Sequence, residues 1–366
     1  MVRFLSEYRD KDLAQGILKS IEKISKKSAN FMEVCGTHTV AISKNGIRHA
    51  LPENIQLISG PGCPVCVTAN IDIDKMLAVL SLPDVIVTTF GDMMKVPGSY
   101  SSLSKERAKG SDVKVVYSTL DAIQIARDNP EKKVVFFGVG FETTTPTIAE
   151  SIIEAKEQNV KNYSVFGAHK VVPPAMKALL DLGEVDLHGF LCPGHVSMVI
   201  GSKPYEFIAR DYHIPCVIAG FEPLDILESV YILIKQVEEG RSEVEVQYKR
   251  AVKPDGNPVA VGVMNQVFEP ADADWRGIGV IPGSGLKIRD EYADFDAARL
   301  FPDIEVPPTR EHKGCRCGDV LRGLIFPYEC ALFGKVCTPT EPVGPCMVSS
   351  EGSCAAYYRY DERVKA

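Results

Sequence analysis

Cysteine is concentrated near the end of this 366-residue chain. Six of its eleven cysteines lie close together in the sequence, and they are Cys315, Cys317, Cys330, Cys337, Cys346 and Cys354. The segment around them is rich in glycine and proline and has no apolar periodicity. Burial of a hydrophobic core cannot order such a segment, so we expect sulfur to cross-link it.

Three cross-links fit a cysteine-rich segment: disulfides, zinc or an iron–sulfur cluster. The first residues turn polar at once, without a leader, and no apolar run approaches the ~18 residues of a membrane span. We therefore expect a cytoplasmic protein, in which structural disulfides are rare. Zinc favours paired Cys-x2-4-Cys motifs, whereas here one Cys-x-Cys precedes gaps of 12, 6, 8 and 7 residues. Wide spacing favours an iron–sulfur cluster, with two thiols left for redox chemistry.

A second group of thiols lies near the N-terminus. Cys35 follows a predicted strand, with His38 three residues on, and Cys63 and Cys66 follow the next strand. Ligands of parallel sheets bind beyond the carboxyl ends of strands, and thiols near helix N-termini have lowered pKa values. Cys63 and Cys66 alone could form a thioredoxin-like dithiol, but the additional Cys35 and His38 suit a thiolate-rich iron site.

Other polar residues are weaker candidates. His169 and His195, the latter shortly after Cys192, fall in similar loops later in the chain and are possible cleft residues. Cys216 lies inside an apolar run, so we expect it in the core. The Gly138-Val139-Gly140 segment lacks the remaining residues of a nucleotide loop, and we expect a hinge or a cleft wall there.

The elements that must position these residues alternate regularly. Short apolar runs, typical of strands, occur at 31–34, 55–58, 85–87, 113–116, 134–137, 164–166, 189–191 and 217–219. Helical patterns lie between several of them, at 71–80, 120–126, 147–155 and 174–180. This alternation predicts an α/β fold with mostly parallel sheets.

An internal similarity suggests two related lobes. The segments 34–40 and 165–171 share four of seven residues, and Pro61-Gly62 and Phe90 match Pro193-Gly194 and Phe221 at nearly the same offset. We therefore predict two lobes that face a cleft and join near 138–145, followed by a C-terminal iron–sulfur domain. The predicted boundaries are 1–30 for an N-terminal helix, 31–140 and 141–240 for the lobes, 241–290 for a connecting segment and 291–366 for the cysteine-rich domain.

Composition excludes some classes of function. Apolar residues make up 45% of the chain, and the net charge of −7 is spread without long basic runs. We therefore expect neither a nucleic acid partner nor a membrane.

Several motifs together resemble the HypD family of hydrogenase maturation factors over nearly the whole length. They are Cys35-Gly36-Thr37-His38-Thr39, Gly60-Pro61-Gly62-Cys63-Pro64-Val65-Cys66, the segment 90–98, Gly140-Phe141-Glu142-Thr143-Thr144, and the six-cysteine tail. The resemblance implies a cytoplasmic scaffold that, with the small chaperone HypC, assembles the Fe(CN)2CO unit of [NiFe]-hydrogenases. It implies cyanide delivery from HypE, a [4Fe-4S] cluster in the tail and a transient Fe(II) carrying the diatomic ligands.

The resemblance also implies roles for the N-terminal group. Cys35 is then the iron ligand shared with the chaperone, His38 is its neighbour, and Cys63 and Cys66 are a dithiol beside it. Electrons for the assembly would pass from the cluster through thiols to this dithiol and on toward Cys35.

For the tail, the family resembles ferredoxin:thioredoxin reductase, where one cysteine of a Cys-x-Cys binds the cluster and the other joins a redox disulfide. That similarity implies that Cys315, Cys330, Cys337 and Cys354 hold the cluster, and that Cys317 and Cys346 form the redox pair. Spacing alone leaves every choice of four from six open.

We therefore interpret the sequence as a metallocentre assembly scaffold with redox activity rather than a conventional turnover enzyme. One alternative is an iron–sulfur thiol–disulfide oxidoreductase that acts on a protein disulfide, which would leave Cys35 and His38 without a role. Another is a zinc-stabilised interaction module, which explains only the tail.

Overall fold

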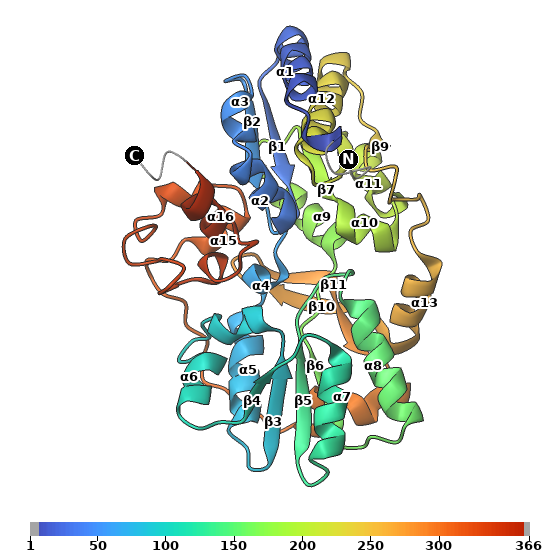
Figure 1. Cartoon of the computed structure of the whole chain (residues 1–366), viewed down its shortest axis with the longest axis vertical. Coiled ribbons are helices and arrows are strands. Elements are labelled where there is room, and N and C mark those ends of the chain that lie inside the picture. The colour runs from blue at the N-terminus through green and yellow to red at the C-terminus, as the bar shows by residue number, and fades with distance from the viewer. Residues whose placement is uncertain (1–6, 362–366) are drawn as a thin grey trace.

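The computed structural model describes residues 7–361. Two parallel sheets lie one above the other along the long axis of the molecule, with a β-hairpin between them and the cysteine-rich tail at one side (Figure 1). The predicted α/β class with parallel sheets is confirmed. All eight predicted strands and all four predicted helices occur, with ends shifted by a few residues.

The upper sheet has five parallel strands in the order β2-β1-β7-β8-β9. Their bounds are β1 (Ala29–Glu33), β2 (Ile55–Ser59), β7 (Gly189–Pro193), β8 (Cys216–Ala219) and β9 (Val244–Val246). One face is covered by α1 (Lys11–Ile24), α2 (Gly36–Lys44), α3 (Ile47–Ala50) and α12 (Pro223–Glu239). The other face packs against α9 (Val172–Leu182), α10 (Gly194–Ile200) and α11 (Glu206–Asp211).

The lower sheet has four parallel strands in the order β4-β3-β5-β6. They are β3 (Val85–Thr89), β4 (Val113–Val115), β5 (Lys133–Gly138) and β6 (Tyr163–Gly167). One face packs on α7 (Thr119–Asp128), α8 (Thr145–Glu157) and α13 (Pro258–Val267). The opposite face packs on α5 (Asn70–Leu80), the 3-10 helix η2 (Gly91–Lys95) and α6 (Leu103–Ala108).

The remaining elements are short. The antiparallel hairpin consists of β10 (Phe268–Trp275) and β11 (Gly279–Ile288), and α4 (Pro64–Val67) lies beside it. The tail contains α15 (Cys317–Leu321), η5 (Pro327–Glu329), η6 (Pro345–Met347) and α16 (Ser353–Tyr360). Four other short helices are η1 (Glu7–Arg9), η3 (Lys203–Tyr205), η4 (Asp290–Phe295) and α14 (Ala297–Leu300).

The two sheets are interleaved in sequence, which corrects the predicted lobe boundaries. Strands β1 and β2 pair with β7 to β9, and the intervening β3 to β6 form the other sheet. The chain therefore crosses between sheets after β2, after β6 and after β9. The predicted join at 138–145 is wrong, because it connects β5 to α8 inside the lower lobe. The internal similarity between 34–40 and 165–171, which predicts consecutive lobes, does not indicate which strands pair.

Two other boundaries also differ. The segment 241–290 contains β9, α13 and the hairpin, which join three different parts of the molecule. Residues 290–300 pack on β6 of the lower sheet, where Asp296 bridges Val165, so the cysteine-rich tail begins later than residue 291. Of the predicted N-terminal helix, residues 1–6 lie outside the described part, and α1 accounts for Lys11–Ile24.

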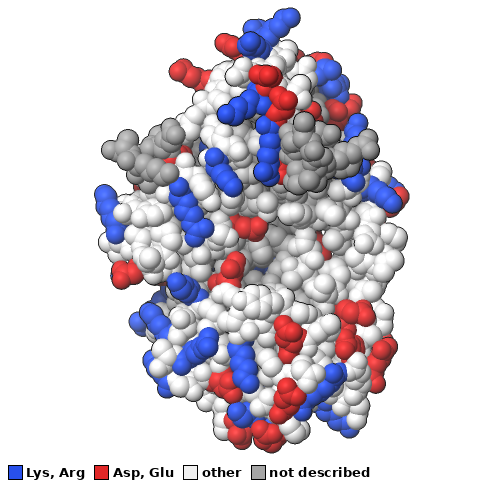
Figure 2. Space-filling model, viewed as in Figure 1, with Lys and Arg blue, Asp and Glu red and all other residues white. Residues whose placement is uncertain are grey.

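One core connects both sheets to the tail. Apolar residues from one face of each sheet form a continuous buried cluster with Cys63, Cys66 and four tail cysteines. On the face shown in Figure 2, charged side chains of both signs cover the upper and lower parts, and the surface between them is largely uncharged. Within residues 7–361, no helix is long and apolar enough to cross a membrane.

Candidate functional site

Cys35 lies where β1 ends and α2 begins. It is the N-cap residue of α2, in an extended conformation, and its side chain is buried. The Gly36 N–H donates to the Gly62 carbonyl at 2.9 Å, which joins this loop to the loop that carries Cys63. A Cβ on Gly62 would lie 2.2 Å from the Cys35 nitrogen, so only glycine permits this close approach. The sheet therefore sets the two thiol-bearing loops against each other.

The tail covers Cys35 through Glu351. The Thr37 hydroxyl donates to Glu351 Oε1 at 2.7 Å, and a Cβ on Gly36 would meet the Glu351 Cβ at 2.5 Å. Burial, and then the Glu351 carboxylate, raise the pKa of Cys35 to about 11, although backbone N–H groups of His38 and Thr37 oppose this. The expected lowering at a helix N-terminus is therefore wrong for this thiol, because desolvation outweighs the N–H groups.

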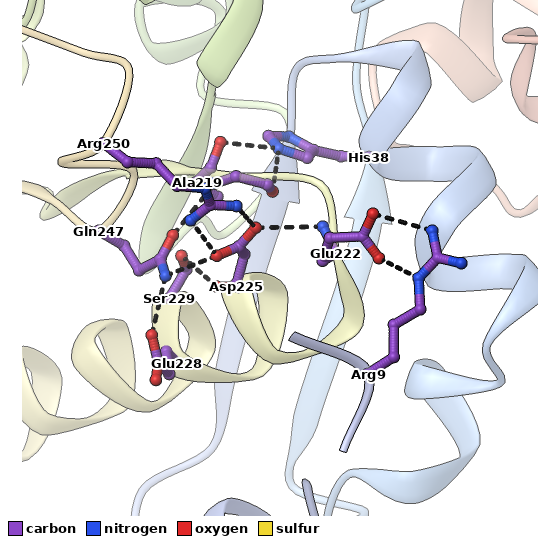
Figure 3. A network of polar contacts seen from close by, with 10 residues as sticks. Arg9, His38, Ala219, Glu222, Asp225, Glu228, Ser229, Gln247 and Arg250 are labelled. Atoms are coloured by element: carbon purple, nitrogen blue, oxygen red, sulfur yellow. Dashed lines mark hydrogen bonds and ion pairs between the residues drawn. The ribbon is translucent and has the colours of Figure 1, made fainter. Parts of the chain in front are cut away.

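The His38 ring points toward the end of β8. Its Nε2 lies 3.1 Å and 3.0 Å from the Ala219 and Gly220 carbonyls at the end of β8 (Figure 3), to which an Nε2–H would donate. Burial lowers its pKa to about 4, so the ring is neutral at physiological pH. Its ring stacks on Phe221, and Phe221 stacks on His195 from α10. The His38 side chain therefore anchors α2 to the end of β8.

The loop that receives His38 is fixed by an ionic network. Asp225 is fully buried near the start of α12, where Arg250 pairs with it and Gln247 donates to it (Figure 3). The Glu222 N–H also donates to the Asp225 carboxylate, and Glu222 in turn pairs with Arg9. These bonds hold the end of β8 rigid, and through His38 they hold the Cys35 loop in place.

Cys63 and Cys66 form a disulfide, with a Cα–Cα distance of 5.2 Å. Cys63 is the N-cap of α4, and the Cys66 N–H donates to the Cys63 sulfur at 3.3 Å. Both residues are buried, at 3% and 0% exposure. The predicted proximity of these two sulfurs is confirmed, and a surface approach by another protein is blocked in this conformation.

Five tail cysteines line one small pocket, and these are Cys315, Cys317, Cys330, Cys337 and Cys354. Apolar Val320, Leu332, Phe333 and Met347 form the rest of its wall, together with Arg316. Cys346 does not line the pocket but is fully buried beside it. A side chain on Gly344 would come within 2.5 Å of the Cys315 sulfur, so glycine keeps space for the sulfurs.

The tail thiols interact with one another. The side chain of Cys317 hydrogen-bonds with those of Cys315, Cys346 and Cys354. The Cys317 hydrogen bond, with help from Arg276, lowers the pKa of Cys315 to about 7, whereas the pKa values of Cys346 and Cys354 are raised. The Val343 N–H donates to the Cys337 sulfur at 3.4 Å. Cys317 and Cys354 both line the pocket and hydrogen-bond Cys346, and Cys317 also hydrogen-bonds Cys315.

The donor set fits an iron–sulfur cluster. The pocket offers sulfur ligands only, within apolar walls, and an N–H already points at one sulfur, as is usual around such clusters. Within the described chain, no three His, Cys, Asp or Glu side chains converge closely enough to hold a single metal ion.

The tail and the disulfide are in contact. The Cys66 sulfur lies 3.9 Å from the carbonyl oxygen of Pro345, the residue before Cys346. Helix α4 packs on η6, and α16 packs on α2, so the tail rests on both N-terminal thiol loops. The structure thereby brings together residues that the sequence separates by almost three hundred positions.

The other candidates have different surroundings. His169 is buried against Gly138 and Phe268 beside the lower sheet, neither of its ring nitrogens is hydrogen-bonded within residues 7–361, and burial lowers its pKa to about 3. His195 follows β7, in the same sheet as the strand before Cys35, and is exposed, which corrects its assignment to the opposite lobe. Cys216 is buried in β8, as predicted, and hydrogen-bonds Cys192 in β7.

Sequence reasoning missed two charged residues of this site. Glu351 stands between two tail cysteines in Ser349-Ser350-Glu351-Gly352, and Arg276 stands at the tip of the hairpin. Neither belongs to a recognisable motif. The position of Glu351 amid the cysteines was the one available signal.

Comparisons with known proteins agree over the whole chain. Residues 12–361 match the HypD family, described as the hydrogenase formation hypA family. The hydrogenase maturation factor HypD2 of Bradyrhizobium diazoefficiens is 47% identical, covering 98% of this chain and 97% of that protein. HypD of Cupriavidus necator is 46% identical, with 98% and 97% coverage, and HypD of Escherichia coli is 44% identical, with 99% of each chain covered.

Proposed function

The chain belongs to the HypD family, and from this premise we propose that it acts in hydrogenase maturation as the scaffold on which the Fe(CN)2CO unit is assembled. In this proposal HypC is the small chaperone that shares the iron, and HypE is the cyanide donor. The chain contributes an iron ligand, Cys35, and a thiol system that delivers electrons to it.

Cys35 is the proposed ligand of the iron cargo. Its thiol is held at the start of α2 by backbone N–H groups of Thr37 and His38, a geometry that favours a thiolate once the proton leaves. Because its pKa is about 11, the thiol keeps its proton until a cation or a partner replaces it. A chaperone that brings iron would displace Glu351 and reach the sulfur from the tail side.

The tail is the proposed electron source. When bound by Cys315, Cys330, Cys337 and Cys354, a [4Fe-4S] cluster supplies electrons one at a time from an external donor. Cys317 and Cys346 are the proposed redox pair, as the similarity to ferredoxin:thioredoxin reductase implies. Their side chains hydrogen-bond each other, and Cys354, which also lines the pocket and hydrogen-bonds Cys346, is assigned to the cluster by the same similarity. As a dithiol, Cys317 and Cys346 hold the two electrons that a disulfide needs.

The transfer to the N-terminal loops is a thiol–disulfide exchange. Cys346, whose raised pKa keeps it a thiol at rest, first gives up its proton; the resulting thiolate attacks the Cys63–Cys66 disulfide and forms a mixed disulfide, which Cys317 then resolves. The products are a Cys317–Cys346 disulfide and the Cys63 and Cys66 thiols, so two electrons and two protons have moved. The reduced pair then lies beside Cys35, because the Cys35 and Cys63 loops are hydrogen-bonded to each other.

One contact carries this proposal. The Cys66 sulfur touches the Pro345 carbonyl at 3.9 Å, so the disulfide borders the segment that holds Cys346. A tail that served only as a structural module would need no disulfide at this junction.

A second candidate function is a thiol–disulfide oxidoreductase that reduces another protein. The buried disulfide next to the tail favours it, because the same relay would operate. Both sulfurs are inaccessible to a protein substrate, however, and Cys35 would have no role. Assembly of the iron unit on a scaffold gives a role to Cys35, to the Cys63–Cys66 pair and to the tail cysteines.

The test is to purify the chain anaerobically with its HypC partner and to measure iron and infrared spectra. We expect iron beyond four per chain, together with bands of cyanide and CO. Iron at four per chain without these bands, but with reduction of a protein disulfide, would favour the oxidoreductase instead. Stoichiometric zinc without sulfide would contradict both.

A further inference from the structure

The tip of the β10–β11 hairpin lies between the loop of the Cys63–Cys66 disulfide and the cysteine-rich tail. The Arg276 N–H donates to the carbonyl of Val67, the residue after Cys66, at 2.9 Å. At the next position, a Cβ on Gly277 would come within 2.2 Å of the Cα of Gly318, the residue after Cys317, and Gly277 has a φ of +77°. The tip therefore fits against both the disulfide loop and the turn that carries Cys317.

Arg276 places a charge at this junction. Its side chain is only 6% exposed. Nη2 donates to the Pro97 carbonyl at 3.0 Å, and Nε pairs with Glu311 at 3.3 Å. Nη1 is buried and has no partner among the described residues. A buried guanidinium that is only partly paired costs folding free energy, so an apolar residue would make a more stable hairpin tip.

The two charges of this pair lie beside the tail thiols. Arg276 and Glu311 line one surface pocket together with Val336, the residue before Cys337, and Val343, whose N–H donates to the Cys337 sulfur. Glu311 is about half exposed, so solvent screens its charge more than that of Arg276.

We propose that Arg276 and Glu311 set the reduction potential of the redox centre in the tail, Arg276 raising it and Glu311 lowering it. The inference rests on the proposed function, because it requires a cluster in the pocket lined by Cys315. Reduction adds one electron and hence one negative charge to a centre already surrounded by thiolates. A buried positive charge stabilises that reduced state, and a nearby carboxylate destabilises it.

The reduction potential that Arg276 would raise affects two steps of the proposed relay. In the proposed function the tail reduces the Cys63–Cys66 disulfide, whose two residues are 3% and 0% exposed and lie beside the same hairpin tip. A higher potential makes the centre easier to charge from an external donor but weakens it as a reductant. The Arg276–Glu311 pair sets the balance between these two steps.

The experiment is a redox titration of the cluster in anaerobically purified full-length variants, monitored by visible absorption and electron paramagnetic resonance. In Arg276→Met we expect at least a tenfold lower ratio of reduced to oxidised cluster at a fixed potential, equivalent to about 59 mV for a one-electron couple. Glu311→Gln should raise that ratio, and Arg276→Lys, which keeps the charge, should stay within threefold of the parent protein.

Arg276→Met and Glu311→Gln should shift the reduction potential in opposite directions. A substitution that only loosened the hairpin would shift the potential the same way in both variants, so the two effects can be told apart. Arg299→Met is the matched control, because Arg299 forms an exposed pair with Asp290 away from the tail. An unchanged potential in Arg276→Met with full cluster content would overturn the inference alone. A parent protein that holds no cluster would instead overturn the proposed function on which it rests.

Discussion

The thiols of the N-terminal loops and those of the tail are placed by different means. Cys35 and Cys63 are N-caps of helices that follow β1 and β2, so a parallel sheet with a packed core fixes them. The tail cysteines lie in turns and short helices, outside any sheet. The sheet positions the first group, and we propose that a bound metal group orders the second.

Cys35 and Cys315 also differ in their electrostatics. Burial raises the pKa of Cys35 to about 11. The hydrogen bond from Cys317, with help from Arg276, lowers the pKa of Cys315 to about 7. A thiol of low pKa gives up its proton readily and suits a resident ligand. A thiol of high pKa stays protonated until its cargo arrives. Hydrogen bonds among the tail thiols and burial raise the pKa values of Cys317, Cys346 and Cys354, so this contrast with Cys35 holds for Cys315 and not for the tail as a whole. We propose a resident metal group in the tail because five sulfurs line one pocket there, and a transient one at Cys35.

The largest expected effect is loss of the tail group. In Cys330→Ala or Cys337→Ala we expect the brown colour and the iron and sulfide of the cluster to disappear, because each removes a thiolate ligand. Without its cross-link the tail should become sensitive to protease, whereas the two sheets, which have their own cores, should resist. Metal analysis, absorption spectra and limited proteolysis measure these changes.

The matched control is Cys317→Ser, which should keep the colour because Cys317 belongs to the proposed redox pair. Bleaching in Cys317→Ser would show that the division of the six cysteines is wrong. A colourless parent protein with one zinc per chain would contradict the distinction drawn between the two groups.

The second prediction concerns the transient group. Cys35→Ala should abolish binding of the extra iron with its cyanide and CO ligands and leave the tail cluster intact, because the two lie in separate loops. His38→Ala should reduce loading less, since the His38 side chain anchors α2 to β8 rather than reaching toward the sulfur. Iron quantification and infrared spectroscopy distinguish the two variants. Equal extra iron in Cys35→Ala would move the site to Cys63 and Cys66.

The third prediction tests the connection between the groups. The double variant Cys63→Ala with Cys66→Ala should keep its cluster but stop hydrogenase maturation, because the relay loses its disulfide. In the reduced parent protein, one of the two thiols should alkylate at a pH below the ~8.5 of free cysteine, aided by the start of α4. Peptide mass spectrometry after pH-stepped alkylation measures this, with Cys216→Ala as a control distant from the relay. Normal maturation by the double variant would refute the relay.

The sequence predicted the first group better than the second. Strands at 31–34 and 55–58 with cysteines just beyond them imply a common sheet edge, and the structure places both loops in contact. The interleaving of the sheets was not predictable, because local apolar patterns do not say which strands pair. The internal similarity predicts consecutive lobes with His195 opposite Cys35, whereas His195 follows β7 in the same sheet as β1.

For the tail, the sequence identified the sulfur chemistry but not the geometry. Nothing in the spacing of Cys346 shows that Pro345 would touch Cys66, because that contact depends on α16 packing against α2. Arg276 and Glu351 were missed for the same reason. A single charged residue gains its role from residues that only the tertiary fold brings near.

The smallest expected effect concerns the tail residue that covers Cys35. The Glu351 carboxylate is the second cause, after burial, of the raised pKa of Cys35, so Glu351→Gln should lower that pKa. Cys35 should then alkylate at a lower pH than in the parent protein, yet still above the usual range, because burial remains. The measurement is pH-stepped alkylation of cluster-containing, cargo-free protein, and Glu341→Gln, an exposed tail change, is the control. Removing the cluster should lower the alkylation pH further than Glu351→Gln does, since the freed tail would uncover the thiol altogether. If both treatments leave the alkylation of Cys35 unchanged, the tail does not regulate access to the N-terminal thiols, and the two groups act independently.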